Sequence, residues 1–304
     1  MKVLVTGANG LLGQKLVSLI TEDPENELIA TGRGENRNAS GSYTYESMDI
    51  TDAVGVNEVF SEHQPEVIIH TAAMTNVDQC ELEPSACWSQ NVEAVKILVA
   101  AAEKHHAFFI HLSTDFIFDG EDGPYDEDAT PNPISHYGKS KWESEKILAG
   151  SNLNWAIVRT VLVYGIVPDM SRSNIILWVK KSLEERKEIK VVNDQWRTPT
   201  LAEDLAIGCW LIAQKRASGI FNISGKDFLT PYEMACQTAD FFGLQTNTML
   251  ETDGSIFKQP AKRPPKTGFD INKAKTILNY QPRSFSEGIE MVSEQVKRLQ
   301  VKSQ

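Results

Sequence analysis

The sequence predicts a doubly wound α/β fold, in which helices cover both faces of a parallel sheet, followed by a smaller α/β lobe. Apolar runs of strand length alternate with helical stretches through the first half of the chain, and a glycine-rich turn joins the first strand to the first helix. After about residue 165 the alternation loosens and proline-bearing loops interrupt it. We therefore expect residues 1–165 to form the larger domain, with later segments returning to it, and residues 166–304 to form mainly the second lobe.

Composition narrows the class of protein. The chain has 304 residues, 41% of them hydrophobic, and a net charge of −11, without a lysine/arginine block that would track a nucleic-acid backbone. Its four cysteines form no C-x-x-C pair and have no histidine partners at zinc spacing, so we expect buried thiols and no metal site. No apolar run approaches a membrane span, and the first residues enter a strand pattern without signal-peptide features. We expect a cytoplasmic protein with neither membrane nor nucleic acid as a partner.

The glycine-rich turn is the first candidate binding element. The apolar strand 3–5 enters the sequence Gly-Ala-Asn-Gly-Leu-Leu-Gly at residues 7–13, after which leucines recur at helical spacing. Glycines at such a junction let the backbone approach a pyrophosphate, which the helix N-terminus then stabilises. A plain turn is the alternative, but the place of the loop between strand and helix favours a dinucleotide site in a Rossmann-type domain. The predicted contacts are Gly7, Asn9, Gly10, Leu11 and Gly13.

The end of the second strand bears on which dinucleotide is bound. The strand 28–31 leads into Gly32 and Arg33, where a site specific for NAD usually carries an acidic residue to hold the ribose hydroxyls. An arginine would instead meet the 2′-phosphate of NADP. Arg33 therefore favours NADPH, although a solvated loop arginine is the alternative and the neighbouring Glu35 keeps NADH open.

Two further segments are placed to contact a cofactor. Asp49 and Ile50 would lie beside an adenine, although a helix cap formed at that point is an equally good interpretation. The buried strand 66–70 ends in small residues, including Ala72 and Ala73, which would let a nicotinamide nucleotide lie against the backbone. Two histidines within strand patterns, His70 and His111, are interpreted as core residues with satisfied hydrogen bonds rather than as ligands.

Three side chains suggest proton transfer to a carbonyl group. The strand 108–112 delivers Thr114 to the carboxyl edge of the sheet, where open α/β sheets bind ligands. Tyr137 and Lys141 follow four residues apart at a predicted helix start, so they share a face. Alone, this pair also fits an exposed helix face. Together with the glycine turn it predicts a carbonyl-reducing site, in which Thr114 bonds the carbonyl oxygen, Tyr137 donates the proton, and Lys141 stabilises the phenolate and holds the nicotinamide ribose.

The second half of the chain is predicted to be less regular. Apolar periodicity suggests helices from 175 to 183 and from 201 to 212, with strands at 189–192 and 219–225. Thr230 and Pro231 mark the start of another helix. The proline-rich stretch 259–265 excludes a regular helix, a last short helix follows Phe269, and the polar tail from residue 297 is expected to fray.

Longer motifs resemble the extended short-chain dehydrogenase/reductase family and, within it, the dTDP-4-dehydrorhamnose reductase family. The resemblance spans most of the chain. Its matching stretches are residues 5–13, 71–78, 111–120, 137–145, 158–165 and 193–200. The resemblance implies reduction of a nucleotide-linked 4-keto sugar by NADPH or NADH, with dTDP-L-rhamnose as the product. It places Thr114, Tyr137 and Lys141 in the catalytic roles given above. It also places Thr75, Val77, Asp78, Arg159, Thr198 and Thr200 near the cofactor or the sugar nucleotide.

Departures from the family pattern affect the sugar-facing side. Leu162 stands where these reductases usually carry tryptophan, and Arg197 stands where glycine is usual, so Arg197 either fills part of the sugar site or offers a fork to a phosphate or carboxylate. Arg263 is a candidate diphosphate contact, with a solvated loop as the alternative. The same region resembles the regulatory β subunit of methionine adenosyltransferase, a binding partner that keeps the fold and the cofactor site. A non-catalytic NADP-binding subunit and a reductase or epimerase of another sugar nucleotide therefore stay open, and a homodimer is compatible with either.

Overall fold

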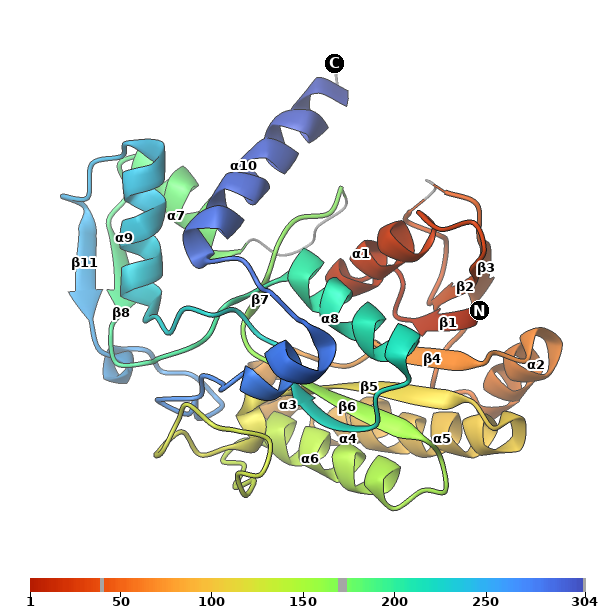
Figure 1. Ribbon diagram of the computed structural model, residues 1–304. Helices are drawn as coiled ribbons and strands as arrows, with labels where there is room; N and C mark the ends of the chain where they lie inside the picture. The colour runs from red at the N-terminus through yellow and green to blue at the C-terminus, as the bar shows by residue number, and fades with distance from the viewer. Residues whose placement is uncertain (39–40, 169–173, 303–304) are drawn as a thin grey trace.

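The computed structural model describes residues 1–38, 41–168 and 174–302, and its main feature is a seven-stranded parallel sheet with the order β10-β6-β5-β4-β1-β2-β3 (Figure 1). Six strands follow the doubly wound order, and β10 from the second half of the chain pairs with β6 at one edge. The predicted fold class is confirmed. The strands are β1 Lys2–Thr6, β2 Glu27–Gly32, β3 Thr44–Ser47, β4 Val67–His70, β5 Phe108–Thr114, β6 Trp155–Thr160 and β10 Gly219–Asn222.

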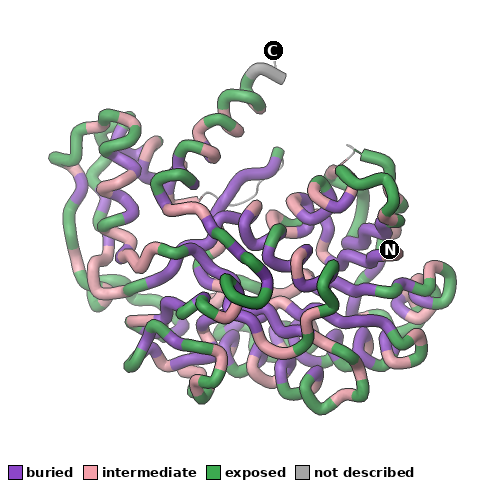
Figure 2. The backbone as a smooth tube through the Cα atoms, in the orientation of Figure 1, coloured by how far each residue is buried: buried purple, intermediate pink, exposed green. Residues whose placement is uncertain are grey.

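Two helix layers bury the two faces of this sheet. One face packs on α1 and α8 through a cluster that includes Leu16 and Leu205, and the other packs on α2, α5 and α6 through a cluster that includes Phe60 and Leu98. The five inner strands of the sheet are almost continuously buried, whereas the edge strand β3 is not (Figure 2). The bounds are α1 Leu11–Ile20, α2 Ala53–His63, α5 Ala94–His105, α6 His136–Ala149 and α8 Ala202–Lys215.

Shorter elements surround the carboxyl edge of the sheet. They include α3 Val77–Leu82, α4 Pro84–Trp88, the π-helical turn η1 Ser89–Glu93, and the 3-10 turn η2 Asp115–Ile117. A second π-helical turn, η4 Ala274–Leu278, lies where the last short helix was predicted. Among the described residues, none of the helices combines the length and apolar character needed to cross a membrane.

In the part of the second lobe that the structure describes, three helices pack beside two small parallel strand pairs (Figure 1). Strand β8 pairs with β11, and β7 pairs with β9. The helices contribute to two small apolar clusters that are separate from the large-sheet core. The bounds are β7 Val163–Tyr164, α7 Ile175–Glu184, β8 Ile189–Val192, β9 Thr200–Leu201, α9 Pro231–Phe242, β11 Met249–Thr252, the 3-10 turn η3 Gly254–Ile256 and α10 Phe285–Lys302.

The C-terminal helix α10 begins before the tail that was expected to fray from residue 297 and continues through it to Lys302. Phe285, Ile289 and Val292 are almost fully buried and lie on one helix face, against α9 of the second lobe. Their spacing of four and three residues is a helical signal in the sequence, which the expectation of a frayed tail did not take into account. The end of the tail, residues 303–304, lies outside the described residues.

Candidate active site

The glycine turn has the geometry that a dinucleotide needs. Gly7 has a φ of +72°, and a Cβ there would lie 2.7 Å from the Ala72 nitrogen, so only glycine fits. A Cβ on Gly13 would lie 2.2 Å from the Gly7 oxygen. Gly10 caps α1 without a side-chain hydrogen bond, which leaves the N–H groups of the first helical turn open to an anion. The turn therefore brings Ala72 against the loop and presents α1 as a phosphate cradle.

Asn9 links this turn to the loop that carries Arg33. Its side-chain nitrogen donates to the main-chain oxygens of Arg33 (3.3 Å) and Glu35 (3.0 Å), and its side-chain oxygen accepts from the Arg37 nitrogen at 2.9 Å. Its amide is thus used within the protein, and Asn9 shapes the cofactor loop through the backbone. Arg33 is exposed, and it contributes to the lowered pKa of Asp49, for which the main cause is the Thr51 main-chain N–H. The structure therefore brings Arg33 and Asp49 together.

The remaining predicted cofactor residues line the edge next to the turn. Ile50 is buried behind Asp49, while Ala72 and Ala73 are half-buried at the end of β4. Thr75 is exposed. Val77 is the first residue of α3, whose cap is the Asn76 side chain.

The end of β5 packs closely against the start of α6, and this contact brings the predicted catalytic residues Thr114 and Tyr137 near each other. Ser135 caps α6 by accepting from the Gly138 nitrogen at 3.1 Å. A Cβ on Gly138 would lie 2.0 Å from the Phe116 oxygen, so glycine permits the helix to press against the turn that follows Thr114. The Thr114 hydroxyl consequently lies near enough to the Tyr137 phenol to act on its pKa, while it donates to the Asp115 carboxylate at 3.0 Å.

Burial decides the protonation of Tyr137. The side chain is 8% exposed, and desolvation raises the pKa of its phenol, with Asp115 adding to the rise and the contact with Thr114 opposing it. The Lys141 amine lies 3.2 Å from Nε2 of His111, and burial lowers its pKa to about 8, against the opposing influence of Glu145. At neutral pH Tyr137 therefore holds its proton, which is the form that a proton donor requires.

Two of the predicted substrate residues pair with each other. Both oxygens of Asp78, on α3, accept from the Arg263 guanidinium, at 2.8 and 2.7 Å, and the same carboxylate accepts from the Ala261 nitrogen at 3.2 Å. The Arg263 fork is also bonded to the Ala261 oxygen. These bonds hold the proline-bearing segment 261–267 over the start of α3.

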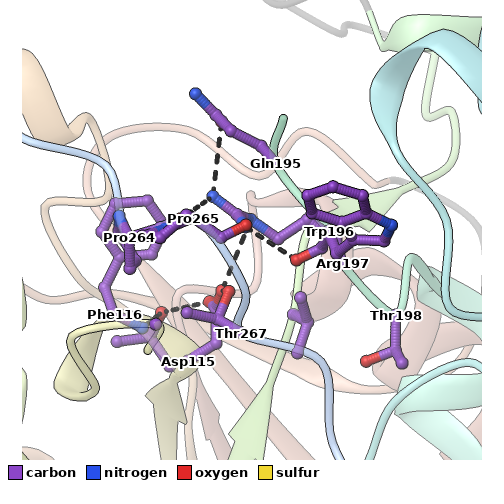
Figure 3. A network of polar contacts seen from close by, with 12 residues as sticks. Asp115, Phe116, Gln195, Trp196, Arg197, Thr198, Pro264, Pro265 and Thr267 are labelled. Atoms are coloured by element: carbon purple, nitrogen blue, oxygen red, sulfur yellow. Dashed lines mark hydrogen bonds and ion pairs between the residues drawn. The ribbon is translucent and has the colours of Figure 1, made fainter. Parts of the chain in front are cut away.

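Arg197 fastens the other end of the 261–267 segment (Figure 3). Its guanidinium donates to the main-chain oxygens of Trp196 (2.7 Å), Pro264 (2.7 Å) and Pro265 (3.2 Å), and its Nε lies 3.8 Å from the Asp115 carboxylate. The side chain is buried. Its donors are engaged within the protein here, so a fork offered to a phosphate or carboxylate of a ligand stays a prediction. The bulk of this side chain fills space beside Asp115.

The other substrate-side residues are also engaged within the protein. Thr200 Oγ1 donates to the Val161 oxygen at 2.6 Å, and Thr198 Oγ1 accepts from the Phe269 nitrogen at 3.2 Å. Arg159, which the family pattern places near the ligand, forms a buried bidentate pair with Glu145. Leu162 has a φ of +38° and is 43% exposed, so it presents an apolar side chain where the family usually has tryptophan.

Sequence reasoning missed two polar residues of the site. Asn91 is 1% exposed within the π-helical turn η1, and its side chain bonds both main-chain groups of Met74 and the hydroxyl of Ser140 next to the catalytic helix. His111 contacts Lys141, and its Nδ1 has no partner, so its hydrogen bonds are not all satisfied. His111 is a polar residue inside an apolar run, whereas Asn91 lies in a mostly polar stretch that gives no such signal.

A group of potential metal ligands lies away from this edge. Glu46 on β3 and Glu62 and His63 on α2 bring one ligand atom each within 4.8 Å of one another. The group is at the margin of the sheet and contacts none of the three catalytic candidates.

The fold and the site define a short-chain dehydrogenase/reductase of the extended type: a doubly wound sheet, a glycine turn at its first βα junction, and threonine, tyrosine and lysine at its carboxyl edge. The chain belongs to the family described as the RmlD substrate binding domain, whose pattern matches residues 1–298. The predicted family is confirmed.

Individual relatives differ in what they are known to do. Methionine adenosyltransferase 2 subunit beta from Bos taurus is 34% identical over 294 residues, covering 95% of this chain and 86% of the relative. A probable low-salt glycan biosynthesis reductase from Haloferax volcanii is 30% identical, covering 91% of this chain and 92% of the relative. The crystal structure of dTDP-4-dehydrorhamnose reductase from Bacillus anthracis in complex with NADP superposes with a TM-score of 0.84, at 28% identity, covering 97% of this chain and 99% of that chain.

Proposed function

We propose that this protein is an NADPH-preferring reductase of a nucleotide-linked 4-keto-6-deoxy sugar, with dTDP-4-dehydrorhamnose as substrate and dTDP-L-rhamnose as product. The observation that carries the proposal is the close approach of the α6 start to the turn after Thr114, which places a buried Tyr137 that holds its proton near Thr114, on the sheet edge shared with the glycine turn. The family match and the related NADP complex support the same chemistry.

The residues present fit a nicotinamide dinucleotide. Gly7 and Gly13 permit the close turn, the uncapped start of α1 suits the pyrophosphate, and Arg33 is free to face a 2′-phosphate. When bound there, the reduced dinucleotide supplies a hydride to the keto carbon. Tyr137 gives its proton to the carbonyl oxygen, so that the ketone becomes a secondary alcohol.

The other two catalytic residues stabilise charge in this step. Thr114 orients the carbonyl oxygen through a hydrogen bond while negative charge develops on it. Lys141, as an ammonium, stabilises the phenolate that Tyr137 leaves behind, and it positions the ribose. Because burial lowers the pKa of Lys141 to about 8, the charged form is lost as the pH rises through that value. The rate should therefore fall on the alkaline side.

A second candidate is a non-catalytic NADP-binding subunit of a larger enzyme. The observation that favours it is the set of contacts that closes the sugar-facing side: the Asp78–Arg263 pair and the Arg197 bonds to the 261–267 segment. The likeness to methionine adenosyltransferase 2 subunit beta supports it as well.

Loss of reduced cofactor separates the two candidates. Purified protein would be mixed with NADPH and a panel of 4-keto-6-deoxy sugar nucleotides that differ in sugar and base, and absorbance of the reduced nicotinamide would be followed. The reductase should oxidise NADPH with at least one member, dTDP-4-dehydrorhamnose first among them. Binding of NADPH without oxidation by any member would favour the regulatory subunit.

Replacing Arg33 with alanine should weaken NADPH far more than NADH, because the guanidinium would meet only the 2′-phosphate. A lost charged hydrogen bond of this kind costs about 1.5–3 kcal/mol, a roughly 10- to 150-fold weaker Kd. Fluorescence titration with each cofactor measures the effect, and NADH serves as the internal control. Equal weakening of both cofactors would show that Arg33 does not contact the 2′-phosphate.

A further inference from the structure

The strand residue His111 lies directly behind the proposed catalytic lysine. Its side chain on β5 is fully buried, with Nε2 placed 3.2 Å from the Lys141 amine and 2.8 Å from the Ser144 hydroxyl. Nδ1 has no partner in the described structure. The ring stacks on His70 at 5.3 Å between centroids, and His70 is itself bonded to Thr6. Among the described residues, the imidazole therefore makes its polar contacts through Nε2 alone, with Lys141 and Ser144.

The positions of the hydrogen atoms determine whether Nε2 of His111 donates or accepts a hydrogen bond. Burial lowers the pKa of His111 well below its usual value, so the ring is neutral and carries one proton. The Ser144 hydroxyl donates to the Lys141 main-chain oxygen at 2.7 Å, so its oxygen is left to accept from Nε2–H. With its proton on Nε2, the ring cannot accept from the Lys141 ammonium. An ammonium in this place needs the other tautomer, which leaves an N–H at Nδ1 buried without a partner.

Other titratable groups near Lys141 lie on α6, on α4 and on the strands of the sheet. Glu145, one turn further along α6, favours the ammonium, although it is already paired with Arg159 of β6. The Cys87 thiol on α4 acts in the same direction. From the sheet, neutral His70 and His111 face the amine. Burial is the main cause that opposes the charge on Lys141, and the neutral His111 ring, although it contacts the amine, supplies no negative charge to offset it.

We propose that His111, oriented by Ser144, is a positioning residue that loosens the hold of Lys141 on its proton. The catalytic role of Lys141 rests on the proposed function, whereas the test of this proposal does not depend on it. In the reaction, an amine that releases its proton readily can return one to the Tyr137 phenolate after each turnover. His111 and Ser144 together therefore set the pH above which the reaction rate begins to fall.

Direct titration of Lys141 tests the proposal in the full-length chain. Lysine labelled with 13C at the ε carbon would be followed by NMR from pH 6 to 11, with the Lys141 signal assigned by its loss in Lys141→Met. In Ser144→Ala the Nε2–H tautomer loses its acceptor, so the Lys141 midpoint should rise by about half a pH unit or more, a roughly threefold gain in proton affinity. His111→Gln, which offers a carbonyl oxygen to the ammonium, should raise the midpoint as well and serves if Ser144→Ala does not fold.

Ser140→Ala is the matched control. Ser140 is fully buried on the same helix and donates to the Tyr137 main-chain oxygen at 2.7 Å, the same bond that Ser144 makes one turn later, but it contacts Asn91 and Cys87 and not His111. Because the Ser140 bond to Cys87 supports the Lys141 ammonium, the Lys141 midpoint in Ser140→Ala should not rise above the wild-type value. Equal midpoints in Ser144→Ala, His111→Gln and wild type would overturn the proposal. Because the titration needs no substrate, a protein without reductase activity would contradict the proposed function and leave this result standing.

Discussion

Replacing Tyr137 with phenylalanine should lower kcat by about a hundredfold or more, because the substitution removes the only atom that can give a proton to the carbonyl oxygen in the proposed reaction. The phenyl ring keeps the apolar contacts with Cys80 and Cys87, so the fold should be unaffected. NADPH oxidation with the best sugar nucleotide of the panel measures kcat. Fluorescence titration with NADPH should give an almost unchanged Kd, which separates a chemical defect from a binding defect.

Tyr232→Phe is a suitable control for this measurement. It removes the hydroxyl of a tyrosine on α9, in the second lobe, and should leave kcat at the wild-type value. If Tyr137→Phe also retained the wild-type kcat, Tyr137 would not be the proton donor. If the wild type were inactive with every sugar nucleotide, the two proteins could be compared only by cofactor binding. That result would favour the non-catalytic NADP-binding subunit.

The sequence was most informative where local pattern and function coincide. The glycine turn, the strand end at Thr114 and the capped helix start at Ser135 are each encoded within about ten neighbouring residues, and parallel strands must end at a common edge. These constraints predicted the fold class and brought Thr114, Tyr137 and Lys141 to one region. The structure adds the physical lock between them, which is the close approach of Gly138 to Phe116.

Contacts between residues that lie far apart in the chain could not be predicted from the sequence in this way. Asp78 and Arg263 are 185 residues apart in the chain, and Arg197 bonds an oxygen 67 residues later, so no periodicity connects them. Each was predicted from a motif as a ligand contact, and each is engaged by another part of the protein. The contact of Lys141 with His111 was missed for a related reason: helix spacing places the lysine near Tyr137, but only packing shows that its amine contacts His111.

Replacing Arg159 with methionine should lower the free energy of unfolding by about 3–5 kcal/mol, the cost of leaving one buried partner of an ion pair uncompensated. Arg159 on β6 donates to both oxygens of Glu145 on α6, at 3.1 and 2.8 Å, and also to the Glu127 main-chain oxygen. The two side chains are only 3% and 5% exposed, so water cannot replace the lost bonds. Urea unfolding followed by circular dichroism measures the change.

Two variants show whether the loss comes from the stranded carboxylate. Arg298→Met breaks an arginine–glutamate contact on α10 in which the two side chains are 76% and 56% exposed, so it should change stability by less than about 0.5 kcal/mol. Adding Glu145→Leu to Arg159→Met removes the buried charge and should recover part of the loss, because an apolar pair of similar volume needs no partner. A double variant less stable than Arg159→Met would instead mean that Glu145 has a second stabilising contact, for which Lys141 is the candidate on the same helix.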